Sequence, residues 1–507
     1  MIASLAERRW APWALFALLA LWLPFTALFH DIDYDESQYL GAVALMRTGL
    51  PFRDFFYLQT PLHPLLLAPF AWIAQGWLFV ALRLATAAAV GATMVLVYRT
   101  VLVHGGSQRR ALLAVAFMAL CEPVIFIGAV ARNDATPMLL EAIGTTLLLR
   151  DWRAPRPSAS FLLAGLFMGA AISTKLQFAL IGIAAGLVML VRWRRLGVGP
   201  ILLYLAGGLF GCLPMLIFWR LAPDAFAFAI FRYPLTAPGQ WYHLGHRDEI
   251  FSPFVVLLRL FRFTAVGPTL IAIGMIVRSR IVSRRQDDML LLLDALIAAG
   301  LIAGILPQPI FRQYLAPLYP VLFMRFGLTD FAWPRRRLWQ GLLAISLVAA
   351  LVETADVEGG SILANAIHGA PPPVDAVRDA HWIARAVPAG SRVAGLAPER
   401  YVDSGLPFDR RFSTGPFIFR TEGLVLYSQA LTWHVVPRAQ MGTLFAADPP
   451  DAIVAGGYRA PDVAAPHGLD ADIEAWARGH GWTGQISPSG AITVYLRPER
   501  RMENQRP

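Results

Sequence analysis

The sequence has few charged residues, two cysteines and a single lysine. Charged side chains make up 15% of its 507 residues and hydrophobic ones 56%, whereas about a quarter of the residues of a typical soluble domain are charged. This composition excludes an ordinary soluble protein and predicts a polytopic membrane protein. Cys121 and Cys212 lie far apart in apolar segments, which argues against a disulfide framework or a cysteine-based metal site.

The formal net charge of +10 does not indicate a nucleic-acid partner. The arginines are clustered in short segments between apolar runs, which is the pattern of cytoplasmic loops beside anionic lipid. We therefore expect contact with membrane lipid and no binding of nucleic acid. The clusters expected inside are Arg8/Arg9, Arg109/Arg110, Arg150/Arg153/Arg156, Arg192/Arg194/Arg195, Arg278/Arg280/Arg284/Arg285 and Arg335/Arg336/Arg337.

About eleven apolar runs could cross the bilayer. The first is interpreted as a retained span, because it is longer than a signal-peptide core and lacks a clear cleavage site. All the clusters fall inside only if residues 61–76 do not cross fully. Three prolines there, Pro61, Pro64 and Pro69, predict a broken, partly embedded helix. The candidate crossings are residues 10–29, 78–98, 111–127, 136–149, 161–173, 178–191, 200–218, 254–277, 289–306, 314–326 and 338–352.

The composition changes near residue 354, where prolines, aspartates and short apolar runs begin. Residues 391–397 and 451–457 predict buried strands, residues 470–482 an amphipathic helix, and residues 485–497 a hairpin that turns at 488–490. The fold class is therefore a mainly α membrane protein with a small C-terminal α/β domain. The predicted domains are a transmembrane domain, 1–353, and an extracytoplasmic domain, 354–507.

The stretch "HDIDYDESQYL" gathers four carboxylates, Asp31, Asp33, Asp35 and Glu36, directly after the first span. A capping box would use Asp33 and Glu36, with Gly49 ending the helix. That interpretation leaves Asp31 and Asp35 unexplained.

Two functional interpretations compete for these carboxylates. Closely spaced carboxylates raise the proton affinity of at least one of them, so one could act as a general base on an acceptor hydroxyl. Alternatively, the alternating aspartates, among them Asp33 and Asp35, could coordinate Mg²⁺ or Mn²⁺ through oxygen. In either case the site lies beside the membrane.

The order of these features resembles the GT-C superfamily of glycosyltransferases that use polyprenyl-phosphate sugars, such as protein O-mannosyltransferases and the lipid A aminoarabinose transferase. The resemblance covers most of the membrane part and implies a multi-span GT-C helical bundle. It rests on Asp35, Glu36 and Tyr39, followed by "GLPFRDFFYLQTPLHPLLLAPF" (49–70), "ARNDATPMLL" (131–140), the lysine of "ISTKLQF", and "FRQYLAPLYP" (311–320).

The resemblance also implies roles for individual residues. Asp35 is the expected catalytic base, Glu36 supports it, and Asp134 is the second acidic residue of the site. For Asp134, the alternative is an N-cap for the following helix. One departure concerns phosphate binding, because the aminoarabinose-transferase type has a lysine just before the paired prolines, where this chain has Gln59 and Thr60.

A lipid-phosphate leaving group requires fixed positive charge, since an anion develops as the glycosidic bond breaks. Lys175 is the only lysine among 44 basic residues, and it either binds this phosphate or snorkels to the interface. Arg312 is the expected second phosphate ligand, with Tyr314 beside it.

Three weaker candidates complete the expected site. Arg83, near the outer end of its span, and Arg132, beside Asp134, could bind substrate or pair with neighbouring residues. His63, within "PLHP", either contacts the lipid headgroup or is solvated at the interface.

The sequence therefore predicts an inverting GT-C glycosyltransferase of the bacterial inner membrane, with its N-terminus cytoplasmic and its C-terminal domain outside. Its partners would be a polyprenyl-phosphate-linked sugar donor and a glycan, lipid or protein acceptor. No cofactor is required, although a divalent cation stays possible. The alternative is a non-catalytic transporter of lipid or polysaccharide, but such proteins place ionisable residues near mid-membrane and often show repeated halves.

Overall fold

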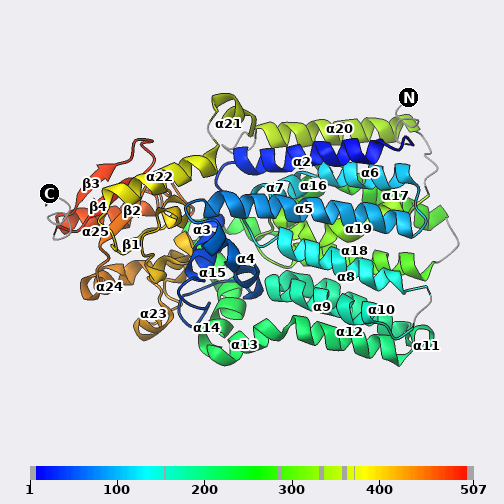
Figure 1. Ribbon diagram of the computed structural model, residues 1–507, viewed down its shortest axis with the longest axis horizontal. Coiled ribbons are helices and arrows are strands. Elements are labelled where there is room, and N and C mark those ends of the chain that lie inside the picture. Colours follow the sequence, from blue (N-terminus) through cyan, green and yellow to red (C-terminus); the bar gives the residue numbers. More distant parts are fainter. Residues whose placement is uncertain are drawn as a thin grey trace. The chain divides into compact units, whose positions relative to one another are not determined.

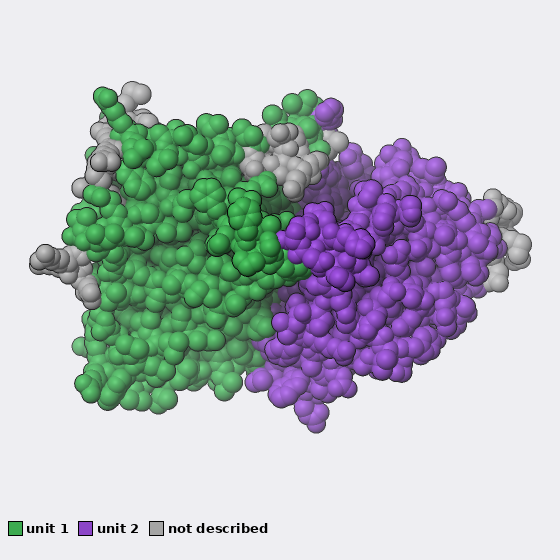
Figure 2. Space-filling view, turned by 180° about the vertical axis from the view of Figure 1, so that it is seen from behind, with its two compact units in different colours: residues 1–30, 84–214, 251–367 green, residues 31–83, 215–250, 368–507 purple. Residues whose placement is uncertain are grey.

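The computed structural model describes residues 7–153, 156–282, 287–330, 336–356, 362–369 and 371–498. Of the predicted cytoplasmic arginines, Arg284, Arg285 and Arg335 lie outside these ranges, and the others lie within them. The chain forms two compact units, and each is built from three separate stretches (Figure 2). Unit 1 comprises Met1–His30, Leu84–Pro214 and Phe251–Ile367, and unit 2 comprises Asp31–Arg83, Met215–Ile250 and His368–Pro507.

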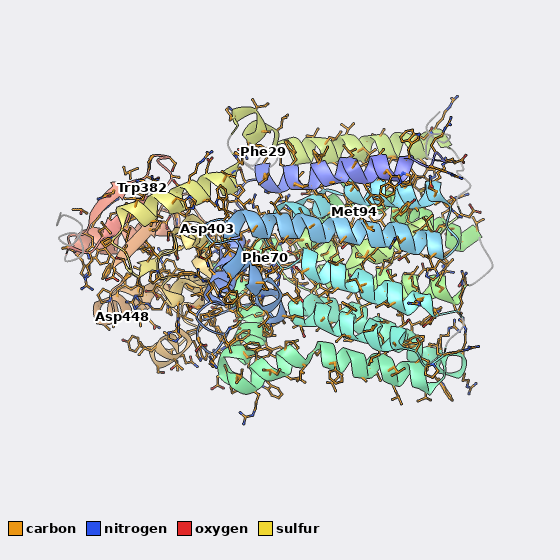
Figure 3. All side chains as sticks on the ribbon, in the orientation of Figure 1. Phe29, Phe70, Met94, Trp382, Asp403 and Asp448 are labelled. Carbon is orange, nitrogen blue, oxygen red and sulfur yellow. The ribbon has the colours of Figure 1, made fainter. Side chains whose placement is uncertain are left out.

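Unit 1 is helical, and each predicted apolar run coincides with one or two described helices (Figure 1). The run 200–218 ends in α13 (Leu213–Leu221), most of which belongs to unit 2. Its core consists of aliphatic and aromatic side chains such as Met94 of α5 (Figure 3). The elements are α2 (Ala11–Phe29), α5 (Leu78–Val103), α6 (Gln108–Ala119), α7 (Glu122–Ala129), α8 (Ala135–Arg150), α9 (Ala159–Thr174), η1 (Leu176–Phe178), α10 (Ala179–Val191), α11 (Trp193–Leu196), α12 (Val198–Gly211), α16 (Pro253–Ala265), α17 (Thr269–Val282), α18 (Asp288–Ile305), η4 (Arg312–Leu318), α19 (Tyr319–Gly327), α20 (Arg336–Asp356) and α21 (Ile362–His368).

Three predicted spans coincide with bent pairs of helices, and two of these pairs bend sharply. Helices α6 and α7 meet at 68°, and α16 and α17 meet at 88°. Between α16 and α17 lies Gly267 with φ +91°, and a Cβ there would be 2.7 Å from the carbonyl oxygen of Leu120. The chain therefore bends at Gly267, where glycine adopts a positive φ at no steric cost, and the crossing over residues 254–277 stays a prediction.

Three described helices, α2, α5 and α18, are long and apolar enough to cross a membrane, and the number rises to six if each bent pair is one span. Helices such as α9 and α20 have shorter apolar segments. The count of eleven crossings stays a prediction.

Unit 2 contains the acidic segment and the proline-rich segment that follows it. Helix α4 (Leu62–Ile73) is continuous, so the prediction of a broken helix is wrong. Pro61 is its N-cap residue and Pro64 lies in its first turn, where a helix needs no backbone donor, and only Pro69 lies inside it.

The C-terminal part of unit 2 contains a four-stranded mixed sheet in the order β1-β2-β4-β3. Strand β1 (Val393–Ala394) is parallel to β2 (Ala452–Ala455), which is antiparallel to β4 (Thr493–Leu496). Strand β3 (Thr483–Ile486) pairs with β4 as the predicted hairpin. Gly490, with φ +73°, donates its N–H to the Ser487 carbonyl over 2.9 Å and closes the turn. The small α/β part is thus confirmed, with shorter strands than predicted.

The other elements of unit 2 are short helices around this sheet and before it. The predicted boundary at 353/354 separates a transmembrane domain from an extracytoplasmic one, and it stays a prediction. The two compact units are a different division, because each is discontinuous in sequence. The elements are α3 (Glu36–Leu45), α13 (Leu213–Leu221), α14 (Pro223–Ala227), the π-helix η2 (Phe228–Arg232), α15 (Tyr233–Leu244), η3 (Asp248–Phe251), α22 (Pro372–Ala386), η6 (Pro398–Arg400), η7 (Val402–Ser404), η8 (Arg410–Phe412), η9 (Gly415–Thr421), α23 (Tyr427–Trp433), η10 (Arg438–Gln440), α24 (Met441–Ala447) and α25 (Asp470–Gly479).

Candidate functional site

The only lysine lies in a buried ion-pair cluster of unit 1. Lys175 is the C-cap residue of α9, and its extended backbone (φ −153°, ψ 118°) ends the helix. Its ammonium group donates a hydrogen bond to Oδ1 of Asp134 and lies 5.3 Å from the centroid of the Tyr314 ring. Lys175 is 6% exposed, so a carboxylate and an aromatic face replace most of the water around this cation.

The Asp134 carboxylate binds Arg132 and Lys175 of this cluster and does not cap the helix that follows it. It occupies the N-cap position of α8, but its side chain accepts no capping hydrogen bond, so the N-cap alternative for its side chain is wrong. Instead, Nε of Arg132 donates to its Oδ2 over 3.3 Å. Nδ2 of Asn133 donates to the Thr174 carbonyl over 3.3 Å and ties this turn to the end of α9.

A second ion pair in unit 1 involves Arg312, the first residue of η4. Its Nη1 donates to Oε1 of Glu122 over 2.5 Å, and its Cζ lies 3.9 Å from the centroid of the Phe126 ring. The Cζ of Arg132 lies 5.7 Å from the same ring. Phe126 therefore contacts both guanidinium groups and joins the two ion pairs into one cluster.

Element η4 is fixed to η1 and α18 through Gln177 of η1. The Nε2 of Gln177 donates to the carbonyl oxygens of Tyr314, over 2.5 Å, and Ala303, over 2.6 Å. These bonds set the position of the Tyr314 ring beside Lys175 and of Arg312 at the start of the same element.

The cluster brings cations and carboxylates together in a mostly buried place. It combines three cations, Lys175, Arg132 and Arg312, with two carboxylates, Asp134 and Glu122. Buried opposite charges hold one another in place, since removing one partner leaves the other unpaired. The Arg312 side chain is the most exposed of the five, at 23%, so its guanidinium group is accessible to an anionic group such as a phosphate.

Glu122 was not predicted from the sequence. The run 111–127 was interpreted as one span, in which a glutamate has no evident place. The break between α6 and α7 puts Glu122 in the first turn of α7. The available signal was the Glu-Pro pair inside an apolar run, because proline is favoured at the first positions of a helix.

In unit 2, Glu36 is a buried ion-pair partner of Arg83. Nε and Nη2 of Arg83 donate to Oε1 and Oε2 of Glu36 over 2.8 and 2.5 Å, and both side chains are fully buried. Nη2 of Arg83 also donates to the Asp31 carbonyl over 2.8 Å. Glu36 thus anchors the acidic segment at the start of α3.

Only half of the predicted capping box forms. The Asp33 N–H donates to Oε2 of Glu36 over 2.8 Å, but Oδ1 of Asp33 accepts the N–H of Asp35 over 3.1 Å. Asp35 is therefore the N-cap residue of α3, without a capping bond from its side chain. Helix α3 ends at Leu45, before Gly49, so the predicted helix end at that glycine is wrong.

The other predicted residues of this segment also lie in unit 2. The rings of Tyr39 and His63 are both buried and meet edge to face, with centroids 5.4 Å apart. Gln59 is half-buried in the stretch before α4. Asp35, Glu36, Tyr39, Gln59 and His63 thus lie in unit 2, and Arg132, Asp134, Lys175, Arg312 and Tyr314 lie in unit 1.

Within the part of the chain that the structure describes, no three His, Cys, Asp or Glu side chains gather in a way that could hold a metal ion. The Asp33 carboxylate already accepts a backbone hydrogen bond from Asp35. The divalent-cation site at the alternating aspartates stays a prediction.

A further carboxyl group, Glu399 of η6, was missed by the sequence analysis. It is buried, and burial raises its pKa to about 8. Its Oε1 lies 3.5 Å from the hydroxyl of Tyr458, which donates to the carbonyl of Tyr34 over 3.3 Å. Tyr34 lies between Asp33 and Asp35. Tyr458, from the C-terminal stretch of unit 2, therefore contacts the backbone of the acidic segment.

The comparisons with known proteins agree with this fold. The family model of dolichyl-phosphate-mannose-protein mannosyltransferase matches residues 58–219. The structure of ArnT from Cupriavidus metallidurans in the apo state is 15% identical with a TM-score of 0.59, and the match covers 95% of this chain and 97% of that one. The structure of the same protein bound to undecaprenyl phosphate is 14% identical with a TM-score of 0.54, and the match covers 96% of this chain and 98% of that one.

A third solved structure, the Archaeoglobus fulgidus oligosaccharyltransferase in the apo form, is 12% identical with a TM-score of 0.51 and is matched over 97% of this chain and 75% of that one. No curated protein sequence matches the chain. These findings confirm the resemblance to GT-C glycosyltransferases and show that the chain has the GT-C membrane fold.

Proposed function

We propose that the protein is a membrane glycosyltransferase that moves a sugar from a polyprenyl-phosphate donor to a hydroxyl group of a glycan, lipid or protein acceptor. The observation that carries the proposal is the fold, shared over 96% of the chain with a structure described as bound to undecaprenyl phosphate. The mannosyltransferase family match over residues 58–219 supports the same class of donor.

The cluster of unit 1 is proposed to bind the phosphate of the donor. As the bond between sugar and phosphate breaks, negative charge grows on the phosphate oxygens, and fixed cations stabilise this state more than the ground state. Lys175 and Arg312 supply these cations. Asp134, bonded to both Lys175 and Arg132, holds the ammonium group in place, so little reorganisation is needed when the charge develops.

Asp35 is proposed as the general base. It takes the proton of the acceptor hydroxyl, whose oxygen then attacks the anomeric carbon, and this single displacement inverts the configuration. Glu36 supports Asp35 indirectly, because its ion pair with Arg83 fixes the start of α3. The reaction is proposed to run without a metal, on the outer face of the bacterial cytoplasmic membrane, with the C-terminal domain on that side.

The test is sugar transfer by the purified full-length protein, with radiolabelled polyprenyl-phosphate hexoses and pentoses as donors and extracted envelope lipids, glycans and proteins as acceptors. The variant Asp35→Asn should lose about 100-fold or more of the turnover number, the usual contribution of a general base. The control Asp224→Asn changes an exposed aspartate of the same unit and should keep full activity. Turnover in EDTA should equal turnover in added Mg²⁺.

Each outcome decides a different part of the proposal. Undiminished turnover by Asp35→Asn would refute the assignment of the base while leaving the transferase intact. Activation by Mg²⁺ would refute the metal-free reaction. No transfer from any donor, with the wild type folded by thermal melting, would favour a transporter instead.

A further inference from the structure

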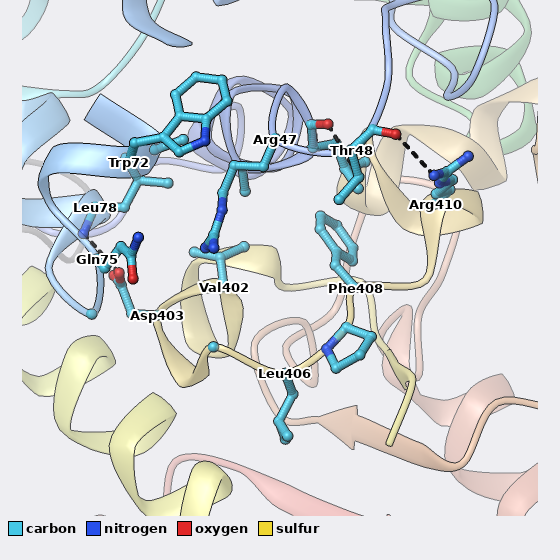
Figure 4. Close-up of a pocket in the computed structure, with 16 residues that line it drawn as sticks. Arg47, Thr48, Trp72, Gln75, Leu78, Val402, Asp403, Leu406, Phe408 and Arg410 are labelled. Atoms are coloured by element: carbon cyan, nitrogen blue, oxygen red, sulfur yellow. Dashed lines mark hydrogen bonds between the residues drawn. The ribbon is translucent and has the colours of Figure 1, made fainter. Parts of the chain in front are cut away.

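Unit 2 contains a pocket of about 580 Å³, within the size range of small-molecule sites. It lies between the end of α3, the end of α4 and the loop that contains Val402 and Phe408 (Figure 4). None of the residues assigned above to the sugar transfer lines it. The pocket is therefore separate from the residues proposed to act on the donor.

The polar side of this pocket is cationic. The Arg47 side chain extends from the end of α3 toward the loop (Figure 4), and its guanidinium group has no hydrogen-bond or ion-pair partner among the described residues. Nη2 of Arg410 donates to the Thr48 carbonyl over 3.0 Å, which holds this second guanidinium group at the pocket. Both arginines remain able to bind an anion, because a guanidinium group has five N–H donors.

The carboxylate in the lining does not offset this charge fully. Asp403 accepts the backbone N–H groups of Leu78 and Phe79, over 2.7 and 3.2 Å, at the start of α5 (Figure 4). These donors and the positive end of the helix dipole already face its negative charge. Two acidic groups near Arg410 are paired with other arginines, Asp54 with Arg53 over 2.7 Å and Asp409 with Arg411 over 2.5 Å.

The other side of the pocket is apolar and continues onto an exposed surface. Trp72 and Phe408 line the pocket. Beside Trp72, Ile73 is 81% exposed and Trp77 is 48% exposed. Large exposed apolar patches mark binding sites, and tryptophan is enriched at the level of lipid headgroups.

We propose that this pocket binds the phosphate-bearing headgroup of an anionic lipid. Arg47 and Arg410 contact the phosphate, and Trp72 with the adjoining apolar surface contacts the glycerol backbone and acyl chains. The combination of two guanidinium groups with an open apolar edge fits an amphiphile better than a free anion, since a free anion leaves Trp72 and Ile73 without a partner. The site goes beyond the proposed transferase reaction and does not depend on it.

The test measures equilibrium binding of radiolabelled dioleoyl phosphatidylglycerol to the detergent-purified full-length protein. Arg47→Gln should weaken binding about fivefold, because one arginine near an anionic lipid contributes about 1 kcal/mol. Arg47→Lys should retain most of the affinity. The control Arg378→Gln changes an exposed arginine of α22 in the same unit, ion-paired with Asp375 over 2.8 Å, and should bind like the wild type.

Two competitors distinguish the possible ligands. Unlabelled phosphatidylcholine and inorganic phosphate should each compete poorly at the concentration at which unlabelled phosphatidylglycerol displaces the label. Unchanged binding by Arg47→Gln, or an equal loss with Arg378→Gln, would overturn the proposal. Displacement by inorganic phosphate at that concentration would also overturn it and identify a site for free anions.

Discussion

Lys175 is the single lysine of the sequence, and its side chain is buried. A chain that uses arginine at its other basic positions and lysine once indicates a place where a compact ammonium group is needed. The structure places this group against the Asp134 carboxylate and the Tyr314 ring. Lys175 and Asp134 are 41 residues apart in sequence, and nothing in the sequence predicted their contact. The contact depends on how α8 and α9 pack.

At the same scale, Glu399 should make stability depend on pH. Burial raises its pKa from 4.5 to about 8, so between these values the folded protein holds a proton that the unfolded chain releases. The stability that this proton contributes is present in full below pH 4.5 and is lost as the pH rises through about 8. The wild type should thus lose on the order of 5 kcal/mol over this range from this group.

The variant Glu399→Gln replaces the buried acid with a neutral side chain of the same shape. We expect it to melt several degrees above the wild type at about pH 9 and within roughly 2 °C of it at about pH 5. The control Glu422→Gln, an exposed glutamate of the same unit, should follow the wild type at both values. A constant difference in melting temperature across the pH range would contradict the proposed protonation.

At the scale of elements, α9 and α12 pack closely through glycines (Figure 1). Gly165 and Gly169 of α9 face Gly207 and Gly211 of α12, and a Cβ at Gly165 would lie 1.9 Å from the Tyr204 carbonyl oxygen. Each helix thus presents a pair of glycines four residues apart, the small-residue spacing that lets helix backbones approach in membranes.

The variant Gly165→Ala should force these two helices apart. We expect a loss of about 2 kcal/mol or more, as for overpacking in a close-packed interior, measured as a lower melting temperature of the purified protein in detergent. The control is Gly341→Ala in α20, where nothing lies within 4 Å of the added Cβ. That variant should match the wild type or melt slightly higher, because alanine favours helix. Equal melting temperatures for both variants would contradict the close packing of α9 and α12.

Helix ends were harder to predict than helices. The apolar runs indicated where helices occur, because a long run of apolar residues is typical of a helix that meets lipid or other apolar side chains on all its sides. The breaks at Cys121 and Gly267 depend on contacts with other helices, as the 2.7 Å approach of a Cβ at Gly267 to Leu120 shows. The ion pair of Glu122 with Arg312 was missed for this reason.

For the whole molecule, the core of unit 2 draws on all three of its stretches. Trp433 of the C-terminal stretch stacks on Phe56, with ring centroids 6.5 Å apart, and contacts Phe228 at 5.2 Å. The Ser413 hydroxyl donates to the Phe56 carbonyl over 2.6 Å. The C-terminal segment therefore completes a core that the earlier stretches begin.

It follows that the fragment 354–507 should not fold alone. Without Phe56 and Phe228, the apolar side of Trp433 is exposed to water, and we expect the fragment to lack cooperative thermal unfolding by circular dichroism. A matched chain that joins residues 31–83 to this fragment through a flexible linker should regain part of the transition. A cooperative transition and dispersed NMR signals for the fragment alone would contradict this prediction.

Composition, periodicity and short motifs are local properties of the chain. They were enough to predict the membrane character, the positions of the apolar helices, the strands of the small sheet and the resemblance to GT-C enzymes. Three contacts became known only from the folded chain: Lys175 with Asp134, Glu36 with Arg83, and Glu399 with the acidic segment through Tyr458. Such pairs join residues tens to hundreds of positions apart, and their contact free energy depends on a packing that no local pattern encodes.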